Sequence, residues 1–455
     1  MKTIVWGFDN FLSCDAIKKL QNEGSIDVCE WFGTPEGPYA TKQTLDWMDL
    51  FRRPEEFSFK NYNAEMASYI QKHMDVILDL FSRNFLFRHS PYYECVNAAH
   101  FLLAYFYTLV QKNKIELILM DDIPHGPGNY LLYLVAKKLQ VKVLILRQTQ
   151  FANRFFYLTD INDFGIFSTL PEYHEQVGNE KIENKFEKNW FYYGVGWEKK
   201  YRPKQSLQKK LNRRILKMKQ SWAKYEDLQE FLYLRCSQNG IERQRKRAYL
   251  KSRERFFNQE IDNNCKYVYF PLHLQPEMTT SMLSNGYSNQ LLALEHLAEF
   301  IPEEWKIYVK EYPGQNYFMR DKYFFRRLAL NPKAVLLKGD INTYDLIRKS
   351  QFVATLVGTV GWEAISGGKN VLTFGHAWYR KLPGVFEYDN GANLREMQTY
   401  SIKHSELENK LNKLFMKTGD AMVAPEYLPL VGEDFSVEEN NENIYRFLSW
   451  ALTIL

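Results

Sequence analysis

The sequence predicts an α/β protein with two Rossmann-like, doubly wound units joined by a basic helical segment. Apolar runs of strand length alternate with helical patterns near the N-terminus and again after residue 266. The chain has 455 residues, which exceeds the usual size of one hydrophobic core. Between the two alternating regions, residues 199–255 contain nineteen Lys or Arg but five acidic residues, in a helix-like pattern.

The first region carries a βαβ pattern. The segment around 115–128 is its clearest part, because a short apolar run ends in a polar loop rich in Gly and Pro and a helical pattern follows. A strand, a crossover helix and a second strand form a parallel pair. The expected strands are 3–6, 26–31, 115–120 and 141–146, and the expected helical stretches are 11–23, 63–112 with a break near Ser90-Pro91, and 129–139.

The basic segment interrupts this pattern. A solvated helical face is one interpretation, and a surface for an anionic lipid or an anionic acceptor is the other. Nucleic acid is not an expected partner, because no recognised nucleic-acid motif accompanies the charge.

The second region again alternates strands and helices. Its expected strands are 267–272, 306–310, 335–338, 352–357 and 371–374, and its expected helices are 289–300, 343–349 and 362–366. Residues 440–455 have the pattern of an amphipathic helix.

Several protein classes are disfavoured by what the sequence lacks. The five cysteines are odd in number and form no CxxC pair, which indicates reduced thiols and a cytoplasmic protein. The sequence has no signal-peptide pattern and no apolar run of membrane-spanning length. It has no GxGxxG, GxxxxGK[ST], HExxH or GxSxG motif, so we expect neither a bound cofactor nor a metal.

Polar residues follow four strands of the second region. Ligands bind outside the carboxyl ends of the strands in open parallel sheets, so these loops form one candidate site. In the loop 358–363, glycines bracket Thr359 at a helix start, where backbone N–H groups favour an anion. Glu363 can accept hydrogen bonds from sugar hydroxyls, although a glycine turn with a capping glutamate explains the loop equally well.

The second half resembles the bacterial capsule polysaccharide biosynthesis family, which includes Kdo (keto-deoxy-octulosonate) transferases that use CMP-activated sugar. The matching stretches are YFPLHLQPE at 269–277, VKEYPG at 309–314, TLVGTVGWEAISGGKNVLTFGHAWY at 355–379 and, more weakly, residues 121–146. The resemblance implies a GT-B architecture, in which two Rossmann-like domains face a cleft and the C-terminal one holds the nucleotide. It also implies a C-terminal helix that packs back on the first domain. The expected parts are therefore an acceptor domain (1–170), a basic helical linker (171–265), a nucleotide-sugar domain (266–430) and the returning helix (431–455).

Relatives that use CMP-sugars carry a Gln-Pro and a His-Pro dipeptide near the nucleotide. Gln275-Pro276 matches the first, and Tyr312-Pro313 stands at the place of the second, with tyrosine instead of histidine. The expected co-substrate is a nucleotide-sugar, with CMP as the nucleotide. The candidate donor-binding residues are Gln275, Pro276, Lys310, Glu311, Tyr312, Pro313, Gly358, Thr359, Val360, Gly361, Glu363 and His376.

Glycosyl transfer needs a base for the acceptor hydroxyl and stabilisation of the departing phosphate. The candidate bases follow the strand at 115–120 and are Asp121, Asp122 and His125, with Asp9 behind them. A capped helix start explains either aspartate singly. The expected partners are a nucleotide-sugar donor, a glycan or glycolipid acceptor and, through 199–255, an anionic surface such as that of the inner membrane.

Three other functions remain open at this point. The first is a nucleotide-sugar epimerase on the same fold, which needs no separate acceptor. The second is a non-catalytic scaffold, in which the loop at 358–363 is expected to be degraded. A nucleic-acid-binding protein would use the basic helices but leaves the four polar loops unexplained.

Overall fold

The N-terminal unit is built on a seven-stranded sheet in the order β13-β6-β5-β4-β1-β2-β3. The computed structural model describes residues 1–34, 44–52, 63–84, 87–176, 178, 181–182, 228–256, 261–262, 264–432 and 434–455. The strands are β1 (Lys2–Trp6), β2 (Asp27–Phe32), β3 (Thr44–Leu45), β4 (Leu117–Met120), β5 (Lys142–Gln148), β6 (Phe155–Leu158) and β13 (Thr418–Gly419). β1 to β5 pair in parallel, whereas β6 runs antiparallel to β5 and to β13.

Helices cover both faces of this sheet, because successive side chains of its strands point to opposite sides. Val5 packs in one apolar cluster with α1 and α16, and Ile4 packs in another with α3, α4 and α5. The helices of this unit are α1 (Cys14–Asn22), η1 (Trp47–Arg52), α2 (Ala64–Gln71), α3 (Met74–Arg83), α4 (Tyr92–Lys112), α5 (Pro127–Lys138), η4 (Ile161–Asp163), η7 (Pro425–Leu430) and α16 (Val437–Ile454).

The C-terminal unit has a six-stranded, wholly parallel sheet in the order β12-β11-β10-β7-β8-β9. Its strands are β7 (Tyr267–Pro271), β8 (Lys306–Lys310), β9 (Ala334–Leu336), β10 (Val353–Thr355), β11 (Val371–Thr373) and β12 (Val385–Glu387). Its helices are α9 (Met278–Ser281), α10 (Gln290–Phe300), α11 (Lys322–Leu330), α12 (Thr343–Lys349), α13 (Thr359–Ser366), η6 (Tyr388–Asn390), α14 (Leu394–Thr399) and α15 (His404–Phe415). From β7 the chain extends the sheet in one direction through β8 and β9, and it then crosses back so that β10 lies on the other side of β7. The strand order therefore reverses between β7 and β10.

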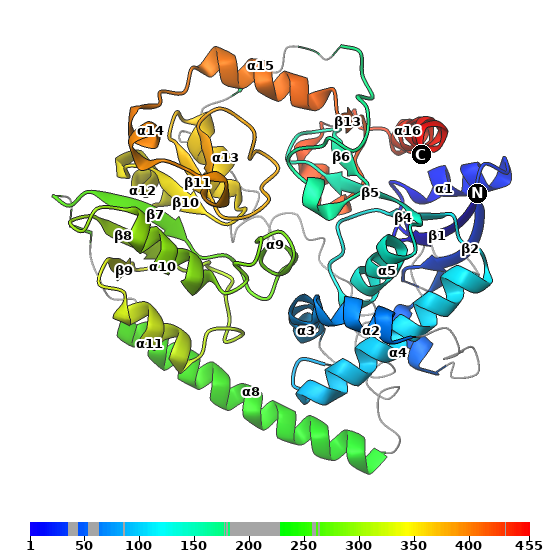
Figure 1. Cartoon of the computed structure of the whole chain (residues 1–455), viewed down its shortest axis with the longest axis horizontal. Helices are drawn as coiled ribbons and strands as arrows, with labels where there is room; N and C mark the ends of the chain where they lie inside the picture. Colours follow the sequence, from blue (N-terminus) through cyan, green and yellow to red (C-terminus); the bar gives the residue numbers. More distant parts are fainter. Residues whose placement is uncertain are drawn as a thin grey trace.

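After α15 the chain returns to the N-terminal unit (Figure 1). β13 joins the first sheet, and α16 packs against α1 close to the N-terminus. The sequence places the start of this return at residue 431, whereas the structure pairs Thr418–Gly419 with β6. The side chain of Asn440 fixes α16 by donating to Leu12 O and Met422 O, both at 2.9 Å.

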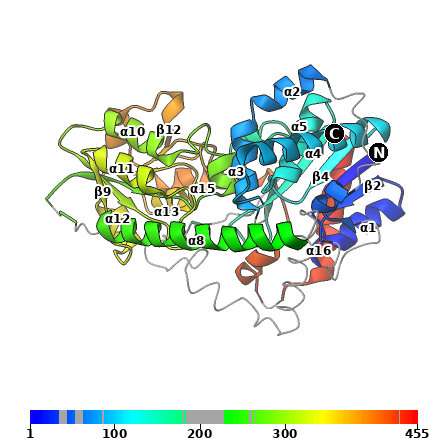
Figure 2. The same cartoon turned by 90° about the horizontal axis from the view of Figure 1, so that it is seen from below.

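Part of the basic segment is one long helix, α8 (Leu228–Phe256), which runs along the outside of the molecule (Figure 2). Residues 199–227 lie outside the described residues. α8 contacts α11, and the buried Tyr249 donates a hydrogen bond to Gln315 O at 3.3 Å. No helix in the described part of the chain is both long enough and apolar enough to span a lipid bilayer.

The predicted fold class is confirmed: the chain forms two Rossmann-like α/β units in a GT-B-like arrangement. The first sheet differs from a purely parallel one, because β6 and β13 add an antiparallel edge.

Candidate functional site

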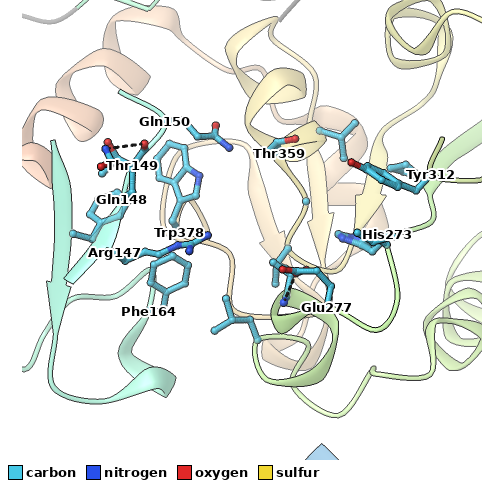
Figure 3. A pocket seen from close by; sticks show the side chains of 18 of the residues that line it. Arg147, Gln148, Thr149, Gln150, Phe164, His273, Glu277, Tyr312, Thr359 and Trp378 are labelled. Atoms are coloured by element: carbon cyan, nitrogen blue, oxygen red, sulfur yellow. Dashed lines mark hydrogen bonds between the residues drawn. The ribbon is translucent and has the colours of Figure 1, made fainter. Parts of the chain in front are cut away.

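A cavity of about 270 Å³ lies between the two units, at the carboxyl ends of β5, β7 and β10 (Figure 3). On the C-terminal side this is the point where the strand order reverses, which is where open α/β sheets bind ligands. The N-terminal unit contributes the end of β5 and the following residues, including Arg147, Gln148, Thr149, Gln150 and Phe164. The C-terminal unit contributes His273, Glu277, Tyr312, Gly358, Thr359, Val360 and Trp378.

The N-terminus of α13 forms one wall of the cavity. Gly358 is the N-cap residue, and its carbonyl accepts a hydrogen bond from the Tyr379 hydroxyl at 2.5 Å. A Cβ at Gly361 would lie 2.1 Å from that hydroxyl, so only glycine fits there. The first-turn N–H groups of a helix have no carbonyl partner four residues earlier, and they favour an anion. Thr359 adds a hydroxyl to this wall.

His273 lies beside this helix start. A Cβ at Gly358 would lie 2.9 Å from His273 Cε1, so the ring packs directly on the loop. The ring Nε2 is 3.0 Å from Thr355 Oγ1 and accepts the Leu356 N–H at 3.3 Å. Burial lowers the pKa of His273 to about 4, and the charge of Arg320 acts in the same direction.

On the other side of the cleft, Arg147 holds Asp122. Arg147 Nη1 is 2.6 Å from each carboxylate oxygen of Asp122. His125 lies next to this pair, with its Nδ1 3.5 Å from Asp122 Oδ2 and 2.6 Å from Ile123 O. Because a carbonyl oxygen only accepts, Nδ1 carries the hydrogen and Nε2 keeps its lone pair in the neutral ring.

Glu277 connects the two sides. Its carboxylate caps α9 by accepting the Thr279 N–H at 2.7 Å, and it lies 4.0 Å from Arg83 Nη2 of α3. Arg83 also donates to His125 O at 2.7 Å. Burial works against the charged carboxylate, but His125, Arg83 and Thr279 outweigh it and hold the pKa of Glu277 below its usual value.

The structure brings four of the candidate donor-binding residues to this cavity: Tyr312, Gly358, Thr359 and Val360. Gln275 and Glu311 instead surround the buried Arg320, which donates to Gln275 Oε1 at 2.6 Å and to Glu311 Oε2 at 3.0 Å. Lys310 is directed to the loop after β9, where it donates to Ile341 O at 2.5 Å and to Thr343 Oγ1 at 3.1 Å.

The remaining candidates of this group lie around the cavity rather than on its wall. Pro276 follows Gln275 through a cis peptide bond, and Pro313 lines a separate pocket under α8. Gly361 packs against Tyr379, and burial raises the pKa of Glu363 to about 7. His376 donates its backbone N–H to Leu283 O at 2.7 Å, and burial lowers the pKa of its imidazole to about 4.

Two of the candidate bases are engaged inside the N-terminal unit. Asp121 accepts the Phe8 N–H at 2.9 Å, and burial raises its pKa to about 8. Asp9 accepts the Thr34 N–H at 2.7 Å. Asp122 and His125 are the two candidates that lie next to the cavity-lining residues Arg147 and Glu277.

Some cavity-lining residues were not among the sequence candidates. The segment 147–150 follows the carboxyl end of a predicted strand, so the strand-end rule applied to the second region also points to it. His273 and Glu277 lie two residues before and after Gln275, which is one of the candidate donor-binding residues. Nothing in the sequence indicates which of the three side chains faces the cleft. No group of three or more potential metal ligands occurs within the described ranges.

Comparison with known proteins gives one family. The capsule polysaccharide biosynthesis protein family matches residues 183–418, just over half of the chain. Among solved structures, the chain is similar to KpsC, a β-Kdo 2,7 transferase of Thermosulfurimonas dismutans, with 14% identity over 75% of this chain and 88% of that one and a TM-score of 0.33. It is also similar to the β-Kdo 2,4 transferase of the same KpsC, with 14% identity over 72% of this chain and 87% of that one and a TM-score of 0.31. A third similar structure is the UDP-GlcNAc 2-epimerase of Methanocaldococcus jannaschii, with 13% identity over 99% of each chain and a TM-score of 0.23. No curated protein sequence matches the chain.

Proposed function

The chain belongs to the capsule polysaccharide biosynthesis protein family, and from this we propose that it is a glycosyltransferase. It moves a Kdo-like sugar from a nucleotide-activated donor to a capsule or surface glycan or a glycolipid acceptor. The observation that carries the proposal is the cavity between the two units, which presents an anion-binding helix start on one side, while on the other the oriented His125 lies next to the cavity-lining residues Arg147 and Glu277.

The donor side of the proposed reaction belongs to the C-terminal unit. The phosphate of the nucleotide lies at the N-terminus of α13, where backbone N–H groups and the Thr359 hydroxyl stabilise the charge that develops as the sugar leaves. We propose CMP as the nucleotide, because Gln275-Pro276 matches the dipeptide of CMP-using relatives. In this mechanism the protein uses neither a metal nor a bound cofactor.

The acceptor side belongs to the N-terminal unit. His125 Nε2 takes the proton of the acceptor hydroxyl as its oxygen bonds to the anomeric carbon of the donor sugar. The bond from that carbon to the phosphate oxygen breaks, and the nucleotide leaves with the electron pair. Ile123 O and Asp122 fix the ring so that Nε2 is the basic nitrogen. Arg147 holds Asp122 and faces the acceptor.

The test combines binding and turnover. Calorimetry with CMP, UDP and GDP identifies the nucleotide, and transfer is then measured with the matching sugar nucleotide and capsule oligosaccharides. His125→Gln should lower kcat by about 100-fold or more and leave nucleotide affinity within about threefold. His404→Gln, at an exposed position at the start of α15, is the matched control. Conversion of the donor without an acceptor would make the protein an epimerase, and no nucleotide binding would favour a scaffold.

We further propose that α8 docks the protein on an anionic membrane surface. Arg243, Arg247, Lys251 and Arg255 are exposed and recur every four residues, so they form one line along the outer side of the helix. Tyr249 is buried on the opposite side, and α8 lies at the surface of the molecule (Figure 2).

Vesicle flotation tests this docking. The wild type should float with vesicles containing phosphatidylglycerol and not with pure phosphatidylcholine, and binding should fall with salt. Reversal of Arg243, Arg247 and Lys251 to Glu should abolish flotation, whereas reversal of Lys410 and Lys413 on α15 should not. Equal binding by both variants would remove α8 from the proposal.

A further inference from the structure

His273 has two ring nitrogens with different surroundings, and these fix its tautomer. The Leu356 backbone N–H lies 3.3 Å from Nε2, and a backbone N–H can only donate. Thr355 Oγ1 accepts the Gly358 N–H at 3.2 Å, which leaves its own hydrogen for Nε2 at 3.0 Å. Nε2 is therefore an acceptor, and the ring hydrogen is on Nδ1.

The ring is also neutral at physiological pH. Burial is the main cause of its low pKa, the charge of Arg320 adds to it, and Glu277 opposes it. A neutral imidazole with its hydrogen on Nδ1 is a hydrogen-bond donor that does not titrate in the working range. Within the described part of the chain, Nδ1 has no hydrogen-bond partner, and the residue lines the cavity.

The position of the ring indicates what it serves. His273 packs on Gly358, the N-cap of α13, so its side chain and the first-turn N–H groups of α13 border the same part of the cavity. A hydrogen bond that strengthens as negative charge grows lowers the barrier, whereas a group that binds ground state and transition state alike does not.

We propose that His273 is a catalytic residue whose Nδ1–H donates to the leaving phosphate oxygen of the donor nucleotide. This inference rests on the proposed transferase function and adds a named donor to the phosphate site. No proton is transferred: the bond between sugar and phosphate breaks, the electron pair stays on the phosphate, and the Nδ1–H···O hydrogen bond shortens. Nε2 meanwhile holds the ring to the end of β10.

A pair of substitutions separates the two nitrogens. In His273→Asn the side-chain amide N–H falls near the Nδ1 position and the Nε2 acceptor is lost. In His273→Gln the amide oxygen falls near Nε2, so the contact with Leu356 N–H is kept and the Nδ1 donor is lost. A role of His273 in holding β10 predicts that His273→Gln binds CMP better than His273→Asn. A role of its Nδ1–H toward the phosphate predicts that His273→Asn binds CMP better.

The experiment measures CMP and cytidine binding by calorimetry for the wild type and both variants, with thermal unfolding to confirm that each is folded. We expect His273→Gln to lose about tenfold in CMP affinity and His273→Asn to stay within about threefold, with cytidine affinity unchanged in both. The kcat of transfer should follow the same order. Better CMP binding by His273→Gln, or an equal loss for CMP and cytidine, would overturn the inference.

The two proposals fail differently. The proposed function fails if the wild type binds no nucleotide, or binds CMP without transferring sugar. The inference about His273 fails on the order of the variants even when the wild type is an active transferase. If the wild type prefers UDP or GDP, then that nucleotide and its nucleoside replace CMP and cytidine in the same comparison.

Discussion

Asp121 shows how one residue behind the cavity makes the stability of the protein depend on pH. The folded state raises its pKa to about 8, mainly by burial and further by the charges of Asp122 and Asp9, although the Phe8 N–H opposes the rise. In the unfolded chain an aspartate titrates near pH 3.9. Between about pH 4 and about pH 8 the folded state therefore keeps a proton that the unfolded state releases, and stability falls as pH rises through this window.

Asp121→Asn should remove this dependence. The amide oxygen still accepts the Phe8 N–H, and no charge has to be buried at high pH. We expect the variant to gain about 1–2 kcal/mol over the wild type at pH 8 and to lose this advantage toward pH 4. Urea unfolding at several pH values measures it, with Asp15→Asn on the exposed part of α1 as the control. Parallel pH profiles for the wild type and Asp121→Asn would contradict the assignment.

Still at the scale of residues, the sequence predicts well which loops form the site. It predicts less well which side chains of these loops face the cavity. The strand-end rule correctly brings the loops at 273–277 and 358–363 together. It does not predict that Gln275 turns inward, because the cause is Arg320, 45 residues away, whose buried guanidinium draws in both Gln275 and Glu311. A buried guanidinium needs hydrogen-bonding or charged partners. The sequence around Gln275 does not indicate that Arg320 lies beside it.

At the scale of elements, a distinct apolar run was predictable as a strand, whereas a strand that depends on a distant partner was not. The run at 117–120 is buried throughout and forms β4 as expected. β6 and β13 have four and two residues, and their pairing joins segments more than 250 residues apart. No local pattern encodes such a pairing, so β13 was not predicted.

The return of the chain to the N-terminal unit depends on α16, and Asn440 is its central polar anchor. Its side chain accepts the Met422 N–H at 2.7 Å and donates to Leu12 O and Met422 O, and it is 3% exposed. Asn440→Ala leaves these backbone groups without partners in a buried place. We expect a loss of about 2–4 kcal/mol in the free energy of unfolding.

Asn443 on the same helix provides the matched control. No hydrogen bond of its side chain occurs among the described residues, and the side chain is partly exposed. Asn443→Ala should therefore change stability by less than about 0.5 kcal/mol. Equal effects of the two substitutions in urea unfolding would show that α16 is held by its apolar face alone.

At the scale of the whole molecule, the two units meet through contacts that also shape the cavity. Phe151 of the N-terminal unit packs edge to face on Trp362 and Trp378 of the C-terminal unit, with ring centroids 5.7 Å apart in both cases. On another side, α3 contacts α9, and Arg83 reaches both Glu277 and His125 O. The arrangement of the two units and the geometry of the proposed reaction centre are thus set by the same residues.

Arg83 should therefore couple the domain contact to the charge of Glu277. The groups that face this carboxylate are Arg83 from α3, His125 from the loop after β4, His273 from the loop after β7, and Thr279 on α9. Arg83→Gln removes a cation that lowers the pKa of Glu277, while burial continues to raise it. The carboxylate then stays protonated to a higher pH. Its negative charge favours the imidazolium that forms on His125 during transfer, so the acidic limb of the kcat profile should move upward. We expect kcat at pH 7 to fall about tenfold and nucleotide affinity to stay within about threefold, because α13 is untouched.

Arg83→Lys should restore part of both effects, and Arg446→Gln on the exposed face of α16 should cause neither. An unchanged acidic limb in Arg83→Gln, with kcat reduced, would mean that Arg83 acts only in packing and that the charge of Glu277 plays no part in turnover.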